Sequence, residues 1–250
     1  MKKTNLTSNM NKSITVFAGM AAVGALVVLA QSAQSQVLYD NTTGNTGYNL
    51  NFAGSAGNEV DLAGPSSANY LITGFIFQYD FVGTGTPTGS VDLSFYRNDG
   101  FPQYHGYYTP GTLLYDSGPF SLTSFTSPAG AQLVYGVPDL AGGTGSGVVA
   151  GGVIVPDQFT WVVTFSDLGA GDSAGLGLYN PPTVGDNYGN NAWMNDGSGW
   201  VLEATIPPYP PAEFGARITG SQVPDSSCLP LSVLSVAMAF GWMKRFQRRG

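Results

Sequence analysis

The chain has 250 residues, of which 43% are hydrophobic and 10% are charged, and its formal net charge is −7. Its 35 Gly and 16 Pro residues favour many turns and short strands over helices. Fifteen of the 16 acidic residues but only two of the nine basic residues lie between positions 37 and 222, which gives that region a formal charge of −13. Phosphate backbones and anionic membrane surfaces would repel it, so we expect no nucleic-acid partner.

The first 35 residues have the order of a secretory signal peptide. Three lysines precede an uncharged apolar run from 14 to 30, and Ala33 and Ser35 place small side chains at the −3 and −1 positions of a cleavage site. We therefore expect residues 1–35 to form a signal helix that is removed after Ser35. The apolar run would also just cross a bilayer, so an uncleaved anchor is the alternative.

Residues 37–222 are predicted to form one domain made of strands. Apolar and polar side chains alternate with a period of two, for example at Val91, Leu93 and Phe95, which share one face of their segment. Such segments predict strands with one buried face. In chain order the predicted strands cover residues 37–41, 69–81, 90–96, 112–116, 132–135, 158–166, 175–179, 199–205 and 213–219.

Turn-forming residues separate these segments. Residues 84–87, 98–100 and 142–152 are rich in Gly, Pro, Asn or Asp, which supply the backbone angles of turns. Many short strands at this spacing predict an all-β, antiparallel β-sandwich that resembles a jelly roll, and no helical pattern interrupts them as a parallel α/β fold would require. Residues 206–212 are predicted as a stiff connector, and 220–223 as a linker to the tail.

The chemistry-bearing residues argue against an enzyme. His105 is the only histidine, and the only cysteine, Cys228, lies beyond the β-domain. Histidine-rich zinc sites, Cys–His nucleophilic sites and an intrachain disulfide are therefore excluded. A glycoside hydrolase with paired carboxylates is the remaining enzymatic alternative, although many of the acidic residues stand next to Gly or Asn, as turn residues do.

Aromatic residues near turns are candidates for ligand binding, because rigid rings stack on the apolar faces of sugars. Tyr104, Tyr107 and Tyr108 stand in one predicted loop, and Trp193 and Trp200 in another stretch rich in Gly and Asn. A carbohydrate-binding module is therefore one hypothesis for the domain. Packing in the core or within the loops is the competing interpretation.

Oxygen-bearing side chains on loops with Gly suit a hard cation such as Ca²⁺. Asp186, Asn195 and Asp196 are the candidate ligands. No segment has the spacing of an EF-hand, so ordinary turn hydrogen bonding is the alternative interpretation. We expect no other cofactor.

The last residues combine three features in order. Residues 223–227 read Val-Pro-Asp-Ser-Ser, residues 228–243 are mostly apolar, and residues 244–250 are basic. A helix over the apolar run would span about 24 Å at about 1.5 Å per residue, somewhat less than a hydrocarbon core of about 30 Å. We expect a transmembrane helix that stops in the membrane, because cationic residues resist translocation. Those residues are Lys244, Arg245, Arg248 and Arg249.

This arrangement resembles a PEP-CTERM sorting signal, and its motif is most similar to the variant Val-Pro-Asp-Ser-Gly. In that family an exosortase, an integral-membrane cysteine transpeptidase, recognises the tail and removes it. The same tripeptide at 137–139 and 155–157 has no apolar run and basic end after it, so only the three-part order is specific. The resemblance implies recognition through Val223, Pro224, Asp225 and Ser226, with Ser227 where the variant has Gly.

Together these features predict a signal peptide (1–35), a β-domain (37–222) and a sorting tail (223–250). We expect an exported, non-catalytic structural or interaction protein of the cell envelope, cell surface or extracellular matrix, which is anchored in the membrane only transiently. Its expected partners are the secretion translocon and exosortase during export, with exopolysaccharide as a further candidate implied by the resemblance. An ordinary single-span anchor is the alternative interpretation of the tail.

Overall fold

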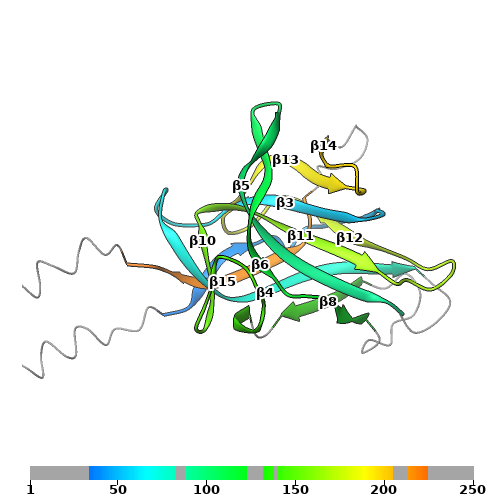
Figure 1. Ribbon diagram of the computed structural model, residues 1–250, viewed down its shortest axis with the longest axis horizontal. Helices are drawn as coiled ribbons and strands as arrows, with labels where there is room; N and C mark the ends of the chain where they lie inside the picture. Colours follow the sequence, from blue (N-terminus) through cyan, green and yellow to red (C-terminus); the bar gives the residue numbers. More distant parts are fainter. Residues whose placement is uncertain (1–33, 83–87, 123–131, 138–139, 205–212, 225–250) are drawn as a thin grey trace, which may run out of the picture. The chain divides into compact units, whose positions relative to one another are not determined.

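The computed structural model describes residues 34–82, 88–122, 132–137, 140–204 and 213–224 (Figure 1). The compact unit that contains the β-domain begins at Ser35. The predicted signal helix and transmembrane helix lie outside the described residues. Within the described residues, no helix is long and apolar enough to cross a bilayer.

The described residues form an all-β fold with two antiparallel sheets and no α-helix. The prediction of an all-β, antiparallel domain is therefore confirmed. The eight-stranded sheet contains β1 (Gln36–Asp40), β2 (Asn45–Asn51), β4 (Asn69–Val82), β8 (Gln132–Val137), β9 (Val148–Val149), β10 (Gly152–Pro156), β12 (Ser173–Tyr179) and β15 (Ala216–Gln222). The seven-stranded sheet contains β3 (Ser55–Asp61), β5 (Ser90–Tyr104), β6 (Tyr107–Asp116), β7 (Phe120–Ser121), β11 (Gln158–Ser166), β13 (Asp186–Asn195) and β14 (Trp200–Ala204).

Strand β4 organises the eight-stranded sheet. The strands run in the order β1-β15-β4-β10-β9, and β4 also pairs with β8 and β12, while β12 pairs with β2. The pairing of β4 with β15 shifts register between Thr219 and Gly220, which form pairs with Gly74 and Ile72. Strand β4 therefore has one extra residue at this point, as in a β-bulge. Before the bulge the buried residues are the even-numbered Tyr70 and Ile72, and after it the odd-numbered positions are buried instead. The buried residues that follow are Phe75, Phe77, Tyr79 and Phe81.

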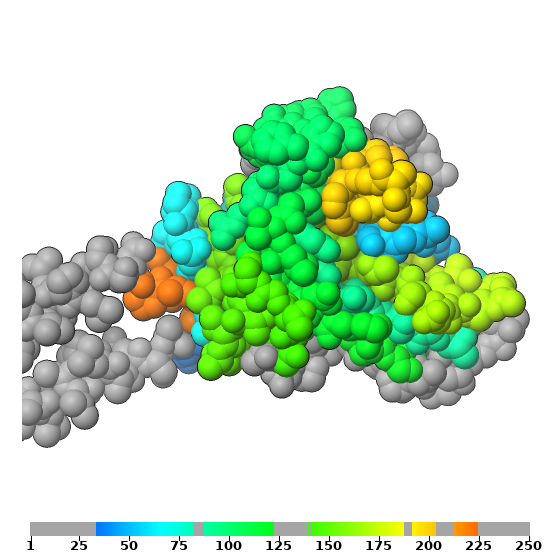
Figure 2. Space-filling view, in the orientation of Figure 1, coloured from blue at the N-terminus to red at the C-terminus, as the bar shows by residue number. Residues whose placement is uncertain are grey.

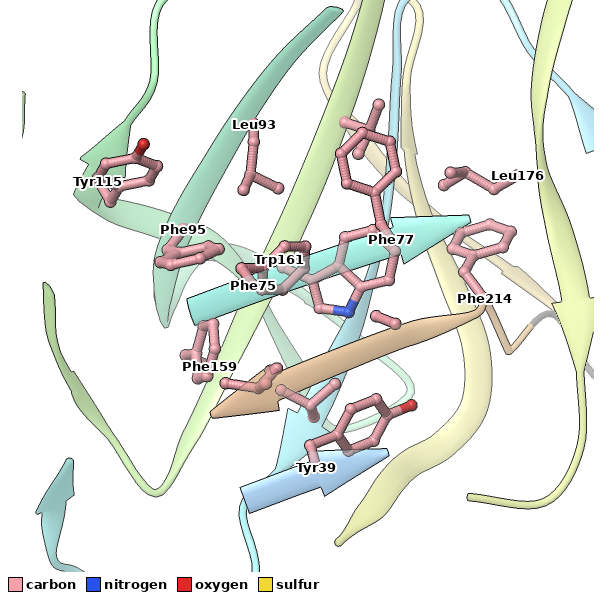
Figure 3. Packing of buried hydrophobic residues seen from close by; sticks show 14 of the residues in the cluster. Tyr39, Phe75, Phe77, Leu93, Phe95, Tyr115, Phe159, Trp161, Leu176 and Phe214 are labelled. Atoms are coloured by element: carbon pink, nitrogen blue, oxygen red, sulfur yellow. The ribbon is translucent and has the colours of Figure 1, made fainter. Parts of the chain in front are cut away.

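The seven-stranded sheet has the order β14-β13-β3-β11-β5-β6, with β7 beside β5. Trp161 on β11 is fully buried and contacts Phe75, Phe77 and Phe214 at ring-centroid distances of 5.4, 6.5 and 6.1 Å. Phe75 and Phe77 belong to the eight-stranded sheet, so aromatic rings from both sheets pack in one core (Figure 3). Large buried rings supply much of the apolar area that stabilises the fold.

The first and last described strands are neighbours. β1 pairs with β15, with Gln36 opposite Gly220, and the backbone N–H of Val223 donates to the carbonyl of Asn69. Gln36 and Val223, close to the two ends of the described domain, therefore lie at the same end of β4. The prediction of a linker at 220–223 was wrong for residues 220–222, because β15 continues to Gln222.

Two predicted turns are strands in the structure. Residues 98–100 lie inside β5, where Asp99 accepts hydrogen bonds from the backbone N–H and the hydroxyl of Thr112 at 2.6 and 2.8 Å. These bonds cross to β6, so the residues that favour a turn are held in a ladder instead. The turn predicted at 142–152 contains the short strand β9. Strand β13 was not predicted, and its pairing with β3 is irregular between Asn187 and Ala192.

Candidate functional site

The β5–β6 hairpin extends well beyond the sheet to which its strands belong. Pairing continues to Tyr104 opposite Tyr107, and the turn residues His105 and Gly106 have φ values of 51° and 92°. Two-residue hairpin turns require such positive values, which Gly adopts freely. Figure 2 shows this green hairpin standing out from the surface beside the yellow segment of β13 and β14.

The hairpin tip carries exposed aromatic rings. Phe101 is 79% exposed and Tyr108 is 43% exposed, and their rings meet edge to face at 5.7 Å. No residue from 101 to 110 carries a formal charge at neutral pH, in a domain that is otherwise strongly acidic. The tip therefore offers an uncharged, apolar surface for contact with another molecule.

A second group of rings lies under the hairpin, on the face of the seven-stranded sheet opposite the core. Trp193 pairs with Gly57, which pairs with Val162, whereas the core residue Trp161 pairs with Asn58. Successive side chains of a strand point to opposite faces, so Trp193 and Trp161 lie on opposite sides of the sheet. We call the rings on this side the outer aromatic layer, which comprises Tyr96, Tyr104, Trp193 and Trp200.

The hairpin covers this layer. Tyr104, near the hairpin tip, contacts Trp193 at 6.0 Å, and Tyr96 contacts Trp200 at 5.9 Å, both edge to face. Trp193 is fully buried and Trp200 is partly buried. The layer therefore holds the long hairpin against β13 and β14.

Glu59 lies beneath the outer aromatic layer. Its side chain is only 7% exposed, and burial raises the pKa of its carboxyl group to about 7. Thr160, its cross-strand neighbour, donates to Oδ1 of Asn98 at 2.7 Å, which leaves the Asn98 amide nitrogen to face Glu59. The amide and the Trp193 indole favour the charged carboxylate and offset part of the rise in pKa, while Asp61 adds to it.

No protein-family model, curated protein or solved structure matches this chain.

The structure divides the five predicted sugar-binding residues into two groups. Tyr108 is exposed, and Tyr107 is partly exposed beside it in the hairpin. Trp193 is fully buried in the outer aromatic layer, so its ring is not presented to an external sugar, and its prediction as a sugar-binding residue is corrected. Phe101, which the sequence analysis missed, is more exposed than Tyr108. Its place in the uncharged run around the tyrosines is the signal that could have identified it.

The predicted Ca²⁺ ligands are not brought together. Asp186 begins β13 and Asn195 ends it, opposite Asp61 and Ser55 at the two ends of β3. Oδ1 of Asn195 accepts from the backbone N–H groups of Gly197 and Gly199, and hydrogen bonds from Ser198 lower the pKa of Asp196. These bonds are turn chemistry. Within the described residues, no cluster of three or more His, Cys, Asp or Glu side chains could hold a metal ion.

Two shallow grooves flank Phe52 and Ala53. One, of about 360 Å³, runs along residues 165–168 and 172–174, and the other, of about 300 Å³, lies between Met194 and Glu203. Glu59 and Asp92 are acids with a raised pKa, which for Asp92 is due to burial and to neighbouring Asp116. Neither residue lines either groove. A carboxylate-pair hydrolase needs its raised-pKa acid in the substrate cleft, so the described grooves do not favour that alternative.

The predicted processing sites lie at the borders of the described region. Ser35, Val223 and Pro224 are described, whereas Ala33, the rest of the sorting motif and the basic cluster lie outside the described residues. Ser35 is exposed, and its hydroxyl is 3.2 Å from that of Thr73.

Proposed function

We propose that the protein is exported, sorted by an exosortase through its C-terminal tail, and displayed at the cell surface or in the extracellular matrix. Its β-domain acts as a non-catalytic structural or interaction module. The secretion translocon and exosortase are its partners during export, and the membrane holds it only until the tail is removed.

The adjacency of the two ends of the β-domain carries this proposal. Gln36 lies opposite Gly220, so a signal peptide cut after Ser35 and a sorting motif that begins at Val223 flank the same end of the domain. From that end, β4 runs from Asn69 to Val82, a path of about 40 Å at roughly 3.3 Å per residue. A chain held at its C-terminal tail would therefore extend the other end of β4 away from the membrane.

The fold proposed for this module is a β-sandwich that resembles a jelly roll. Antiparallel pairing throughout the described strands and the contacts of Trp161 with rings of the eight-stranded sheet support it. Apolar rings fill the space between the two sheets, as they do in a β-sandwich.

An intact-mass measurement tests the sorting proposal. The protein is recovered from the envelope and from the medium of its native host, and its mass is compared with the 26.1 kDa of the full chain. We expect the loss of the first 35 residues and of everything from about Pro224 onward. Retention of residues 244–250 would show an ordinary membrane anchor instead.

A matched pair of variants locates the recognition motif. Asp225→Ala should block removal of the tail, whereas Asp139→Ala changes the same tripeptide at 137–139 and should leave processing unchanged. Equal processing of both variants would show that the tripeptide at 223–225 is not recognised.

The exposed hairpin favours a second candidate function, that of a carbohydrate-binding module. Phe101 and Tyr108 present uncharged rings at a projecting tip, and such rings bind the apolar faces of sugars. The double variant F101A/Y108A should lose retention on insoluble polysaccharide, while Tyr48→Ala, which removes a 50% exposed ring from β2, should not. Equal retention of both variants would exclude the tip as the binding surface.

A further inference from the structure

The two shallow grooves that flank Phe52 and Ala53 are parts of one surface. The first groove also contains the end of β11 and the start of β12, and the second contains the end of β13 and part of β14. In Figure 2 the blue segment that leads into β3 lies between the yellow segment of β13 and β14 and the yellow-green segment of β11 and β12. We call the two grooves together the Phe52 surface.

The floor of the Phe52 surface is apolar and is supported by the core. Phe52 is partly exposed, and its ring centroid lies 5.6 Å from that of Phe165, which is 8% exposed. Leu168 in the first groove and Met194 in the second are partly buried and pack against the hydrophobic core. Because the core holds these side chains in place, the floor is already formed before an apolar group arrives.

Each groove also contains two carboxylate side chains. Asp167 and Asp172 line the first groove, and Asp196 and Glu203 line the second. Three of them are exposed, and Asp172 is partly exposed. Asp196 keeps its negative charge, because hydrogen bonds from Ser198 lower the pKa of its carboxyl group. The apolar floor therefore has an anionic rim.

The described residues supply no cation to this rim. Arg97 and Arg217 are the only Lys or Arg residues in the described part of the chain. Each lies beside another acid, Asp99 at 4.0 Å and Asp40 at 3.6 Å, and neither lines a groove. The Phe52 surface is therefore complementary to a group that is both apolar and positively charged.

We propose that the Phe52 surface binds an extended peptide segment of a partner protein through two Lys or Arg side chains, one in each groove. The aliphatic stem of such a side chain covers the apolar floor while its charged head reaches the carboxylates of the rim. A guanidinium group also binds favourably over the face of a Phe ring. An amino-sugar polymer fits less well, because its amine is attached directly to the sugar ring and offers no aliphatic stem.

The Phe52 surface lies at the end of β4 that is far from the proposed tether. Ser173, in the first groove, pairs with Val82 at the end of β4, whereas Gln222 of β15 pairs with Tyr70 at its start. The biological role of this surface rests on the proposed function, since a module held at β15 would present this end to other proteins. The binding itself does not depend on how the protein is sorted.

Fluorescence anisotropy with a labelled peptide tests the surface. The probe is an end-blocked peptide in which two arginines alternate with serines, and it is added to protein purified from its host with whichever ends it retains. The variant D167N/E203Q removes one charge from each groove and should raise the dissociation constant about 3- to 10-fold, because each exposed ion pair contributes modestly. Asn tolerates the positive φ of 54° at Asp167, so this variant should fold.

The variant D61N/D186N is the matched control. It removes two acids that lie opposite each other at the other end of β3, so it has the same net charge as D167N/E203Q. Its dissociation constant should differ from that of the wild type by less than about twofold, because salt screens charges at this distance. Equal affinities of the two double variants for the arginine peptide would overturn the proposal, and so would the absence of binding to the wild type.

Two further probes identify the chemistry of the ligand. A peptide with citrulline in place of both arginines keeps the side-chain length but loses the charge, so it should bind at least about 10-fold more weakly. A soluble glucosamine oligomer should also bind more weakly than the arginine peptide. Tighter binding of the oligomer would overturn the proposal and assign the surface to a sugar. None of these results bears on removal of the tail, which the intact-mass measurement decides separately.

Discussion

Two tryptophans, Trp161 and Trp193, are both fully buried, but on opposite faces of the same sheet. Trp161 lies among apolar rings from both sheets. Trp193 lies between the buried carboxyl group of Glu59 and the β5–β6 hairpin. The hairpin continues past the sheet and covers the Trp193 ring. Equal burial therefore has two different origins: the inner face is closed by a second sheet, and the outer face by a single hairpin.

Removing each ring tests this contrast most strongly. Trp161→Ala should lower the free energy of unfolding by about 3–5 kcal/mol, because the two sheets around it cannot collapse into the cavity. Trp193→Ala should cost about 1–3 kcal/mol, since only the hairpin must settle onto the sheet. Urea denaturation of both variants measures the difference. A larger loss for Trp193→Ala would mean that the outer layer, rather than the core, dominates stability.

The effect of Glu59 on the pH dependence of stability tests the chemistry of the outer face. Burial raises the pKa of Glu59 to about 7, so the folded state holds this proton up to about pH 7, whereas the unfolded chain releases it near 4.5, the ordinary pKa of a glutamate. The folded state then binds more protons between these values, so stability should fall as pH rises from about 4.5 to 7. Glu59→Gln should flatten part of this slope and should stabilise the protein at pH 8 by about 1–3 kcal/mol.

Denaturation curves collected at a series of pH values measure this effect. Trp161→Ala serves as the control, because it changes the core and should leave the slope with pH as it is in the wild type. A variant of Glu59 whose stability follows the wild-type slope would show that its carboxyl group ionises in the folded state as it does in the unfolded chain.

The smallest effect is expected at the hairpin tip. The double variant F101A/Y108A removes rings that are 79% and 43% exposed, so its free energy of unfolding should stay within about 0.5 kcal/mol of the wild type. Thermal denaturation of the two proteins side by side checks this. A clear loss of stability would place these rings in the cover over Trp193 rather than in a surface for a partner.

The inner face could be predicted from sequence because its residues alternate. Phe159, Trp161 and Val163 point inward, while their neighbours Thr160, Val162 and Thr164 point outward, and this alternation identified β11 with its bounds. Strand β3 was missed because Asn58 points into the core and Glu59 is buried on the other face. The cost of burying the Asn58 side chain is offset by a hydrogen bond from the backbone N–H of Phe214. Phe214 is far away in the chain, so no local sequence pattern could predict this partner.

The outer face was only half predictable for the same reason. Tyr104, Trp193 and Trp200 were among the predicted ligand-binding residues. Tyr104 does contact Trp193, whereas Trp200 contacts Tyr96, which was not predicted. These rings are buried because the hairpin is long enough to cover them. The hairpin length was not predicted, because residues 98–100 are typical of a turn although they lie inside β5. The buried polar side chains around Asn41 depend on contacts between segments more than 170 positions apart, such as Asn41 with Phe214, and could not be inferred from spacing.

The position of β15 has a mechanical consequence. This strand lies between β1 and β4 and leads directly to the proposed tether. A drag force on a domain held by this end would pull along the strand and load its hydrogen bonds to both neighbours in shear, so many bonds would have to break together. A strand at the sheet edge, pulled from the side, would release them one after another. A domain held at this end would therefore be attached where the sheet best resists tension.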